Sequence, residues 1–139
     1  MTLYAGSCHC GALQIRLDSP RRPEEMRVGR CACSFCRRHG ARTMGDPAAS
    51  VEFRAAPPDL VRYRFGLGIT DYLLCAHCGT YVGAVMEDGG GSIGIVNVNA
   101  LDIRDTFDAA PPLHHYDGED EEQRRLRRRK FWMPATVIA

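Results

Sequence analysis

The cysteines of this chain constrain its fold more than any other feature. All seven lie in three short clusters: Cys8-His9-Cys10, Cys31-Ala32-Cys33-Ser34-Phe35-Cys36 and Cys75-Ala76-His77-Cys78-Gly79. The third cluster has the C-x-x-C-G spacing of a zinc knuckle, in which a tight turn lets two thiolates bind one ion and the glycine frees the backbone after the second ligand. Near-neighbour cysteines from distant parts of a chain suit the tetrahedral coordination of zinc. The pattern therefore predicts metal binding.

Counting ligands suggests how the cysteines are divided. A structural zinc site uses four ligands, whereas a catalytic site commonly uses three and keeps one position open. One partition gives a closed site and an open site, with ligands Cys8, Cys10, Cys75 and Cys78 for the first and Cys31, Cys33 and Cys36 for the second. A site that mixes Cys31/Cys33 with Cys75/Cys78 satisfies the same count, so the count leaves both partitions open.

With their neighbours, the clusters resemble the glutathione-dependent formaldehyde-activating enzyme family, which includes the centromere protein V domain. The strings that carry this resemblance are Gly6-Ser7-Cys8-His9-Cys10-Gly11, Cys31-Ala32-Cys33-Ser34-Phe35-Cys36-Arg37-Arg38-His39-Gly40 and Cys75-Ala76-His77-Cys78-Gly79-Thr80. It implies a mostly β, Mss4-like fold of small antiparallel sheets. It also implies two zinc ions per fully loaded chain, a structural ion at the outer pairs and a more labile, catalytic ion at the middle triplet.

The activity implied by the resemblance is that of a carbon–sulfur lyase, which joins glutathione and formaldehyde reversibly as S-hydroxymethylglutathione. An open zinc position can bind a small thiol substrate and lower its pKa, or polarise a carbonyl group. Three thiolates and one Zn²⁺ leave a net negative charge, which Arg37 or Arg38 would offset. We identify no glutathione-binding set of residues. A non-catalytic zinc-binding module that acts through protein contacts, and a thiol or metal buffer, are the alternatives.

Histidine could also bind zinc, and the five histidines differ in how well they suit this role. His39 follows the triplet and is the best candidate for a proton carrier or a ligand at the open position, although a surface or structural role fits equally. His9 and His77 lie between cysteine ligands and are expected to point away from the metal. His114 and His115 receive no function. Ser34 and Phe35 lie between the triplet ligands and would line a substrate position.

Length and composition bound the other possibilities. The 139 residues, with a net charge of +1, predict a single domain over residues 1–139 and give no indication of a nucleic-acid partner. The N-terminus lacks a secretory pattern, and no apolar run approaches the ~18 residues of a membrane span. Reduced cysteines then favour the cytoplasm, where thiols stay free to bind metal. The oligomeric state is not predicted.

The hydrophobic pattern predicts strands and a short helix near the C-terminus. Alternating or apolar runs indicate strands over residues 12–17, 27–31, 51–53, 60–65, 70–74, 81–86 and 92–98. Residues 118–130 place acids before bases with i,i+4 spacing, which suits a short exposed helix with a solvated charged face rather than a nucleic-acid patch. Phe131-Trp132-Met133-Pro134 is interpreted as an apolar anchor that returns the tail to the body.

Overall fold

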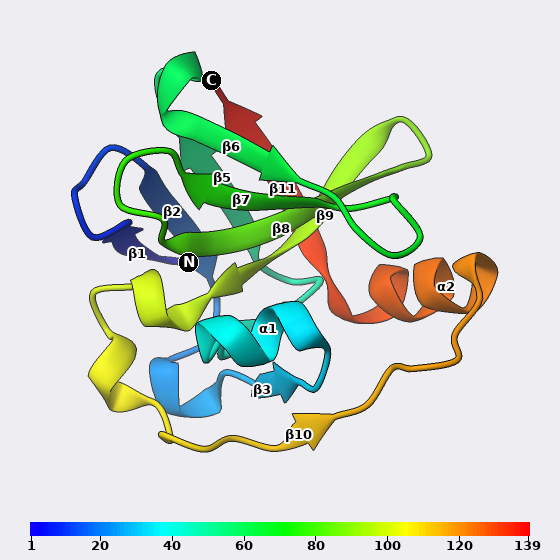
Figure 1. Cartoon of the computed structure of the whole chain (residues 1–139). Helices are drawn as coiled ribbons and strands as arrows, with labels where there is room; N and C mark the ends of the chain where they lie inside the picture. Colours follow the sequence, from blue (N-terminus) through cyan, green and yellow to red (C-terminus); the bar gives the residue numbers. More distant parts are fainter.

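The computed structural model describes all residues from Met1 to Ala139, and most of its regular structure is β-strand (Figure 1). The strands are β1 (Thr2–Ser7), β2 (Gln14–Ser19), β3 (Val28–Cys31), β4 (Thr43–Met44), β5 (Ser50–Arg54), β6 (Leu60–Tyr63), β7 (Asp71–Cys75), β8 (Tyr81–Asp88), β9 (Gly91–Asn97), β10 (Leu113–His114) and β11 (Met133–Ile138). The helices are α1 (Ser34–His39) and α2 (Glu121–Phe131), with short 3-10 turns at Pro23–Glu25, Pro57–Asp59, Val98–Ala100 and Arg104–Thr106. The predicted mostly β fold and the short C-terminal helix are confirmed. No helix is long and apolar enough to cross a membrane.

The sheet branches at β9. One path runs β1-β2-β5-β11-β9-β4-β3-β10, and a second path reaches β9 through β6, β7 and β8. In Figure 1 the larger part of the sheet lies above α1, β3 and β10, while α2 lies to one side. This arrangement brings the loop after β1 close to the turn between β7 and β8, so the first and third cysteine clusters meet.

The main core lies between strands whose apolar residues alternate. On β2, Ile15 and Leu17 are buried while Gln14 and Arg16 are exposed, because successive side chains of a strand point to opposite faces. Phe53 on β5 joins them in the main hydrophobic cluster. The predicted alternation over residues 12–17 is thus correct in face, with the strand displaced two residues toward the C-terminus.

A β-bulge on β8 directs Tyr81 into a second, smaller hydrophobic core. The register between β7 and β8 shifts between Leu73 and Leu74, and Val82 has no partner in the ladder. An extra residue reverses the facing of the side chains beyond it. As a result Tyr81 packs with Ala84 and Met86 in the second hydrophobic cluster, which also contains Cys36 and Trp132.

The tail is more than the predicted anchor. Trp132 and Met133 are buried as expected, but the chain continues as β11, which pairs with β5 in parallel and with β9 antiparallel. Gly94 on β9 makes this pairing possible, because a Cβ there would lie 2.6 Å from the Ala84 carbonyl oxygen and 2.9 Å from Ala135 Cβ. The C-terminal residues are therefore part of the sheet. Strands β1, β4 and β10 were also missing from the sequence prediction.

Helix α2 begins at Glu121, three residues into the predicted segment 118–130, and Asp120 caps its N-terminus. The Asp120 carboxylate accepts a hydrogen bond from the Gln123 N–H (2.8 Å), and the Gln123 side chain accepts one from the Asp120 N–H (3.0 Å). This reciprocal capping box satisfies two backbone donors at the start of the helix. The basic residues of its last turn, Arg128, Arg129 and Lys130, lie at the negative end of the helix dipole.

Candidate metal centres

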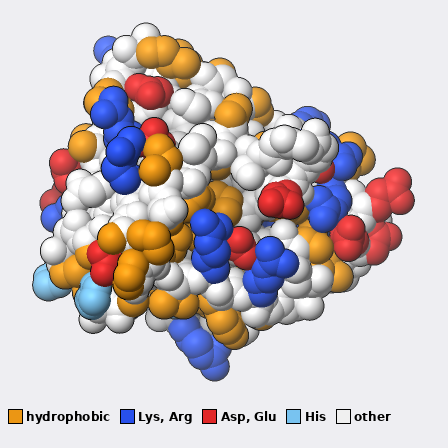
Figure 2. Space-filling view, turned by 90° about the horizontal axis from the view of Figure 1, so that it is seen from above, with side chains coloured by type: hydrophobic (Ala, Val, Ile, Leu, Met, Phe, Trp, Pro, Cys, Tyr) orange, Lys and Arg blue, Asp and Glu red, His pale blue; other side chains and the backbone are white.

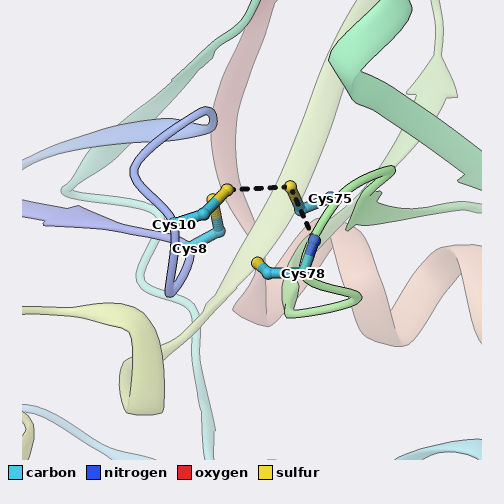
Figure 3. A group of neighbouring side chains, drawn as sticks. All are labelled: Cys8, Cys10, Cys75 and Cys78. Carbon is cyan, nitrogen blue, oxygen red and sulfur yellow. Dashed lines mark hydrogen bonds between the residues drawn. The ribbon is translucent and has the colours of Figure 1, made fainter.

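The first centre joins the two outer cysteine clusters. Figure 3 shows Cys8 and Cys10, from the loop after β1, facing Cys75 and Cys78, from the turn between β7 and β8. The four sulfur atoms lie within 4.8 Å of one another, with Cys10 Sγ 3.7 Å from Cys8 Sγ and 3.5 Å from Cys75 Sγ. A tetrahedral zinc with Zn–S bonds of about 2.3 Å separates its sulfurs by about 3.8 Å. Donor type and spacing therefore fit zinc.

Both turns of this centre direct backbone N–H groups at sulfur. The Leu13 N–H donates to Cys8 Sγ (3.2 Å), and the His77 and Cys78 N–H groups donate to Cys75 Sγ (3.4 and 3.5 Å). Such donors stabilise thiolates that would otherwise repel one another. Gly79 has φ = 76°, so it supplies the left-handed backbone that the knuckle requires after Cys78.

Thr80 links the two turns. Its hydroxyl lies 3.2 Å from Cys78 Sγ and accepts a hydrogen bond from the His9 N–H (3.3 Å). Although desolvation opposes it, hydrogen bonding by Thr80 and neighbouring groups lowers the pKa of Cys78 to about 5. A thiol held as thiolate near neutral pH is a ready metal ligand.

The second centre is built from one short segment. Cys31 ends β3, Cys33 caps the N-terminus of α1, and Cys36 lies in the first turn of that helix. Their three sulfurs lie within 4.8 Å of one another, and no histidine or carboxylate belongs to the group. Of the two partitions that the count allowed, the structure shows four outer cysteines in one group and the triplet in the other. All seven cysteines are free of disulfide bonds.

The start of α1 shapes the electrostatics of the triplet. The Cys36 N–H donates to Cys33 Sγ (3.3 Å), and the Cys33 N–H donates to Cys31 Sγ (3.5 Å). Hydrogen bonding to the Cys31 and Cys36 sulfurs, aided by the Cys36 amide, lowers the pKa of Cys33. Hydrogen bonding to Cys31 and Cys33, together with burial, raises the pKa of the Cys36 thiol. Such crowding favours a cation among the three sulfurs, because a metal ion removes the repulsion between thiolates.

Aromatic rings surround the triplet. Phe35, half-buried between two of the cysteines, lies at the centre of this group. Its ring centroid is 4.5 Å from that of His39, 4.8 Å from Tyr72, 5.0 Å from Tyr81, 5.3 Å from Phe65 and 5.8 Å from Tyr63. The rings come from α1, β6, β7 and β8 and the segment after β6, so the local metal motif is completed by distant parts of the chain. Sequence reasoning placed Phe35 and His39 here by adjacency but missed the rings from β6, β7, β8 and the segment after β6.

Two tyrosines present neutral hydroxyl groups near the triplet. Burial raises the pKa of Tyr72 to about 12 and that of Tyr81 well above its ordinary value, and in both cases the cysteine charges act in the same direction. Both hydroxyls therefore stay protonated at neutral pH. Tyr81 is only 1% exposed, and its hydroxyl has no hydrogen-bond partner. A buried unpaired hydroxyl is costly, which makes this position unusual for a purely structural residue.

The histidines and the flanking arginines lie outside both sulfur groups. The His39 ring lies tilted against Phe35, with the centroids 4.5 Å apart, and His77 Nε2 lies 2.6 Å from Asp59 Oδ1 on the exposed side of the knuckle. Arg37 and Arg38 are exposed on α1, and Arg38 donates to the Ser34 carbonyl at 3.0 Å. Neither arginine forms a hydrogen bond with a cysteine sulfur, so the expected offset of the thiolate charge has no direct contact to support it.

The charged surface is largely paired. Figure 2 shows basic and acidic side chains next to one another on the face seen from above. Asp71 accepts from Arg62 (3.2 Å) and Arg64 (2.6 Å), and Asp88 accepts from Arg129 (2.7 Å). A surface hollow of about 360 Å³ lies among such pairs and contains no cysteine in its lining. The cysteine centres therefore remain the part of the molecule best suited to chemistry.

Fold and centres together define a mostly β protein with one four-cysteine and one three-cysteine group that could each hold a metal ion. A family model described as glutathione-dependent formaldehyde-activating enzyme matches residues 3–118, and the chain belongs to this family. A solved structure of a Rhodobacter sphaeroides protein, a structural genomics target, is similar to it with a TM-score of 0.59. The two are 29% identical, and the similarity covers 79% of this chain and 99% of that chain. All of α2 and all of β11 lie beyond the family match.

Proposed function

We propose that the chain is a zinc-dependent carbon–sulfur lyase that acts on a small thiol adduct, forming or cleaving S-hydroxymethylglutathione or a related compound. The observation that carries this proposal is the triplet of Cys31, Cys33 and Cys36, which offers three sulfurs and no fourth protein ligand. Membership of the glutathione-dependent formaldehyde-activating family supports the choice of substrate. The four outer cysteines would hold a second, structural zinc.

The chemistry requires little of the protein beyond thiol activation and enclosure. Zinc at the triplet would supply a position that takes a thiol as its thiolate. In the forward direction the thiol sulfur forms a bond to the carbonyl carbon of formaldehyde, the carbon–oxygen double bond becomes a single bond, and the oxygen takes the proton that the thiol gives up. Phe35 and the rings around it would exclude water from the reacting atoms.

Cobalt substitution offers a direct test, because the visible spectrum of Co²⁺ reports sulfur ligation. The fully loaded protein should hold about two metal ions, and added glutathione should change the spectrum of one of them. Formaldehyde added afterwards should be consumed faster than in solutions that contain glutathione and no protein. The matched control is Cys33→Ser, which should keep the four-cysteine centre and lose both responses.

Two results would overturn the proposal in different ways. If glutathione changes the spectrum but formaldehyde consumption equals the protein-free rate, the second centre is a thiol or metal buffer. If no thiol perturbs the bound metal, the centre is closed, and a non-catalytic zinc-binding module replaces the enzyme. In that case a fourth protein ligand such as His39 is the residue to seek.

A further inference from the structure

Arg128 on α2 is a buried cation without an anion. Its side chain belongs to a residue that is 4% exposed. One guanidinium nitrogen, Nη1, donates to the Thr70 hydroxyl and to Met86 Sδ, and the planar group lies 4.3 Å from the centre of the Trp132 ring. Its Nε is buried with no hydrogen-bond partner. A buried charge is costly unless it is paired, so this position calls for an explanation.

The acidic residues near α2 do not supply the missing anion. Glu119 pairs with Arg124 and Arg127, and Glu121 pairs with Arg125. Asp88 pairs with Arg125 and Arg129. None of the carboxylates on the helix and on the β8–β9 turn forms an ion pair with Arg128. Burial lowers the pKa of Arg128 to about 10, which leaves the guanidinium charged at neutral pH.

The location of Arg128 connects it to the second metal centre. The two buried side-chain atoms of the protein that lack a hydrogen-bond partner are Arg128 Nε and Tyr81 Oη. The Tyr81 ring lies 6.0 Å from the Tyr72 ring. Arg128 contacts Met86 and Trp132 of the second hydrophobic cluster, against which Tyr72 packs. Tyr72 in turn lies 4.8 Å from Phe35, inside the triplet. The two unpaired buried atoms, Tyr81 Oη and Arg128 Nε, thus both belong to side chains of the region that packs against the triplet.

The thiolates themselves are not the missing partner. The three triplet cysteines act on Tyr72, but they are not among the main groups that shift the pKa of Arg128. No cysteine sulfur accepts a hydrogen bond from the guanidinium, whose contacts are Thr70, Met86 and Trp132. An anion that satisfies Arg128 must therefore come closer than the metal-bound sulfurs do.

We propose that Arg128, with the Tyr72 hydroxyl beside it, binds a carboxylate of the thiol substrate whose sulfur occupies the second metal centre. This inference rests on the proposed function, since it assigns the substrate class of the same site: an anionic thiol that carries a carboxylate. The Nε edge of a guanidinium matches the two oxygens of a carboxylate, and the planar group is held in orientation by Trp132. Tyr72 is half-buried, so part of its side chain is accessible from solvent.

The family match does not include this residue. The match ends at residue 118, whereas Arg128 and Trp132 lie in the C-terminal segment that follows. That segment was interpreted from sequence as a solvated charged face. One of its arginines is instead the most deeply buried charged side chain of the protein. The C-terminal segment would thereby add substrate selectivity to a centre that the family region builds.

The test compares three small thiols on the cobalt-loaded protein: 3-mercaptopropionate, which carries a carboxylate, 2-mercaptoethanol, which is neutral, and cysteamine, which is cationic. Dissociation constants come from the change in the cobalt spectrum, corrected for the thiolate fraction of each thiol. We expect 3-mercaptopropionate to bind at least tenfold more tightly than 2-mercaptoethanol, and cysteamine to bind most weakly. Arg128→Met should remove this preference while leaving the 2-mercaptoethanol affinity within twofold of the wild type.

The matched control is Arg125→Met, one helical turn away, whose guanidinium is paired with Glu121. It should keep the full preference. Arg128→Lys should retain part of it, because a lysine keeps the charge but loses the planar fork. The wild-type comparison of thiols decides the matter even if Arg128→Met fails to fold.

Each other outcome counts against the inference. A wild-type protein that binds the three thiols equally has no carboxylate site. An equal loss of affinity for 3-mercaptopropionate and 2-mercaptoethanol in Arg128→Met would mean that the residue supports the centre as a whole. If thiols bind with no carboxylate preference, the proposed thiol site survives and the Arg128 assignment fails. If none of them perturbs the cobalt spectrum, both fail.

Discussion

The two cysteine centres are built in opposite ways. The first brings together turns that are far apart in sequence: the paired sulfurs of Cys10 and Cys75 are separated by 65 positions. Two of its ligands, Cys8 and Cys75, are buried within the main hydrophobic cluster. The second centre takes its three ligands from six consecutive residues, and only Cys36 among them is buried.

This difference in how the ligands are brought together suggests different roles for the two centres. At the first centre a metal ion would close a long loop and tie the β1–β2 hairpin to the β7–β8 hairpin, so binding the ion would contribute directly to folding. At the second centre the ligand segment is local, and distant strands contribute rings rather than ligands. The first centre should therefore control stability, and the second should control access and exchange.

The largest expected effect comes from removing one ligand of each centre. Cys75→Ala should lose the structural ion and with it the cooperative fold, because a structural zinc supplies on the order of 10 kcal/mol and whole domains are stable by only ~5–15 kcal/mol. Cys33→Ala should remain folded and lose mainly the second ion. Thermal melts together with zinc content per chain measure both effects.

A second variant of the four-cysteine centre tests this prediction independently. Cys8→Ala should behave like Cys75→Ala, since both remove ligands of the four-cysteine centre from different hairpins. If Cys33→Ala unfolds the protein as readily as Cys75→Ala, the division into a structural and an exchangeable centre is wrong. Equal and mild effects of all three variants would show that neither ion matters for the fold.

The two cysteine groups and the strands beside them could be predicted from the sequence, but the long-range packing around the second centre could not. Cysteine spacing is a local property, so the ligand groups and the knuckle turn at Gly79 follow from the chain itself. The strands over residues 70–74 and 81–86 also follow from local patterns, and β7 and β8 match them within two residues at the N-terminal end. Family resemblance, confirmed by the match over residues 3–118, favoured the partition that the structure shows.

Long-range packing explains what the sequence could not predict. Tyr81 faces the second centre because Val82 is extra in the ladder, and a single bulged residue leaves no mark in a hydrophobic pattern. Arg128 lies among charged neighbours in the sequence, and only the position of α2 against β8 and Thr70 shows that it is buried. Strand β11 was missed because its partners, β5 and β9, are far away in the chain.

A smaller effect is expected from opening the aromatic cover of the second centre. Phe35→Ala removes the ring that contacts all the others, which should lower the free energy of unfolding by about 2 kcal/mol. More importantly, metal release from the second centre should accelerate about tenfold, while release from the first centre stays unchanged. Stopped-flow transfer of zinc to a coloured chelator resolves the two ions.

The control for Phe35→Ala is Phe107→Ala. Phe107 is also half-buried, but it packs against the main core rather than the triplet. It should lower stability by a similar amount and leave the release of both ions unchanged. Faster release from the second centre in both variants would mean that general loosening, and not the loss of the ring cover, controls exchange.

The smallest expected effect concerns the segment that lies along the second centre. The Ala32 N–H donates to the His114 carbonyl at 2.9 Å, next to Cys31, so β10 and the residues after it flank the triplet. Glu119 fastens the far end of this segment, accepting from Arg127 at 2.7 and 3.0 Å. The Arg127 guanidinium, 3.5 Å from the centre of the Tyr116 ring, holds that residue in place.

Hydrogen bonding by Arg127, together with its charge and that of Arg124, lowers the pKa of Glu119. A carboxylate whose folded pKa is depressed contributes stability that is fully present above its unfolded pKa of about 4.3 and is lost as pH falls through the folded value. At pH 7 the contribution is therefore complete, and Glu119→Gln should remove it. For a partly exposed ion pair this amounts to about 0.5–1 kcal/mol.

Hydrogen exchange can locate this small loss. In Glu119→Gln the Ala32 amide should exchange about two- to fivefold faster, because its acceptor segment opens more often. The Ala76 amide, which donates to the Asp59 carbonyl at 2.8 Å beside the first centre, should exchange at the wild-type rate. Faster exchange at Ala76 by the same factor would mean that the two centres open as one cooperative unit. Unequal rates would instead show that the cysteine centre built from distant turns stays closed while the locally built one opens.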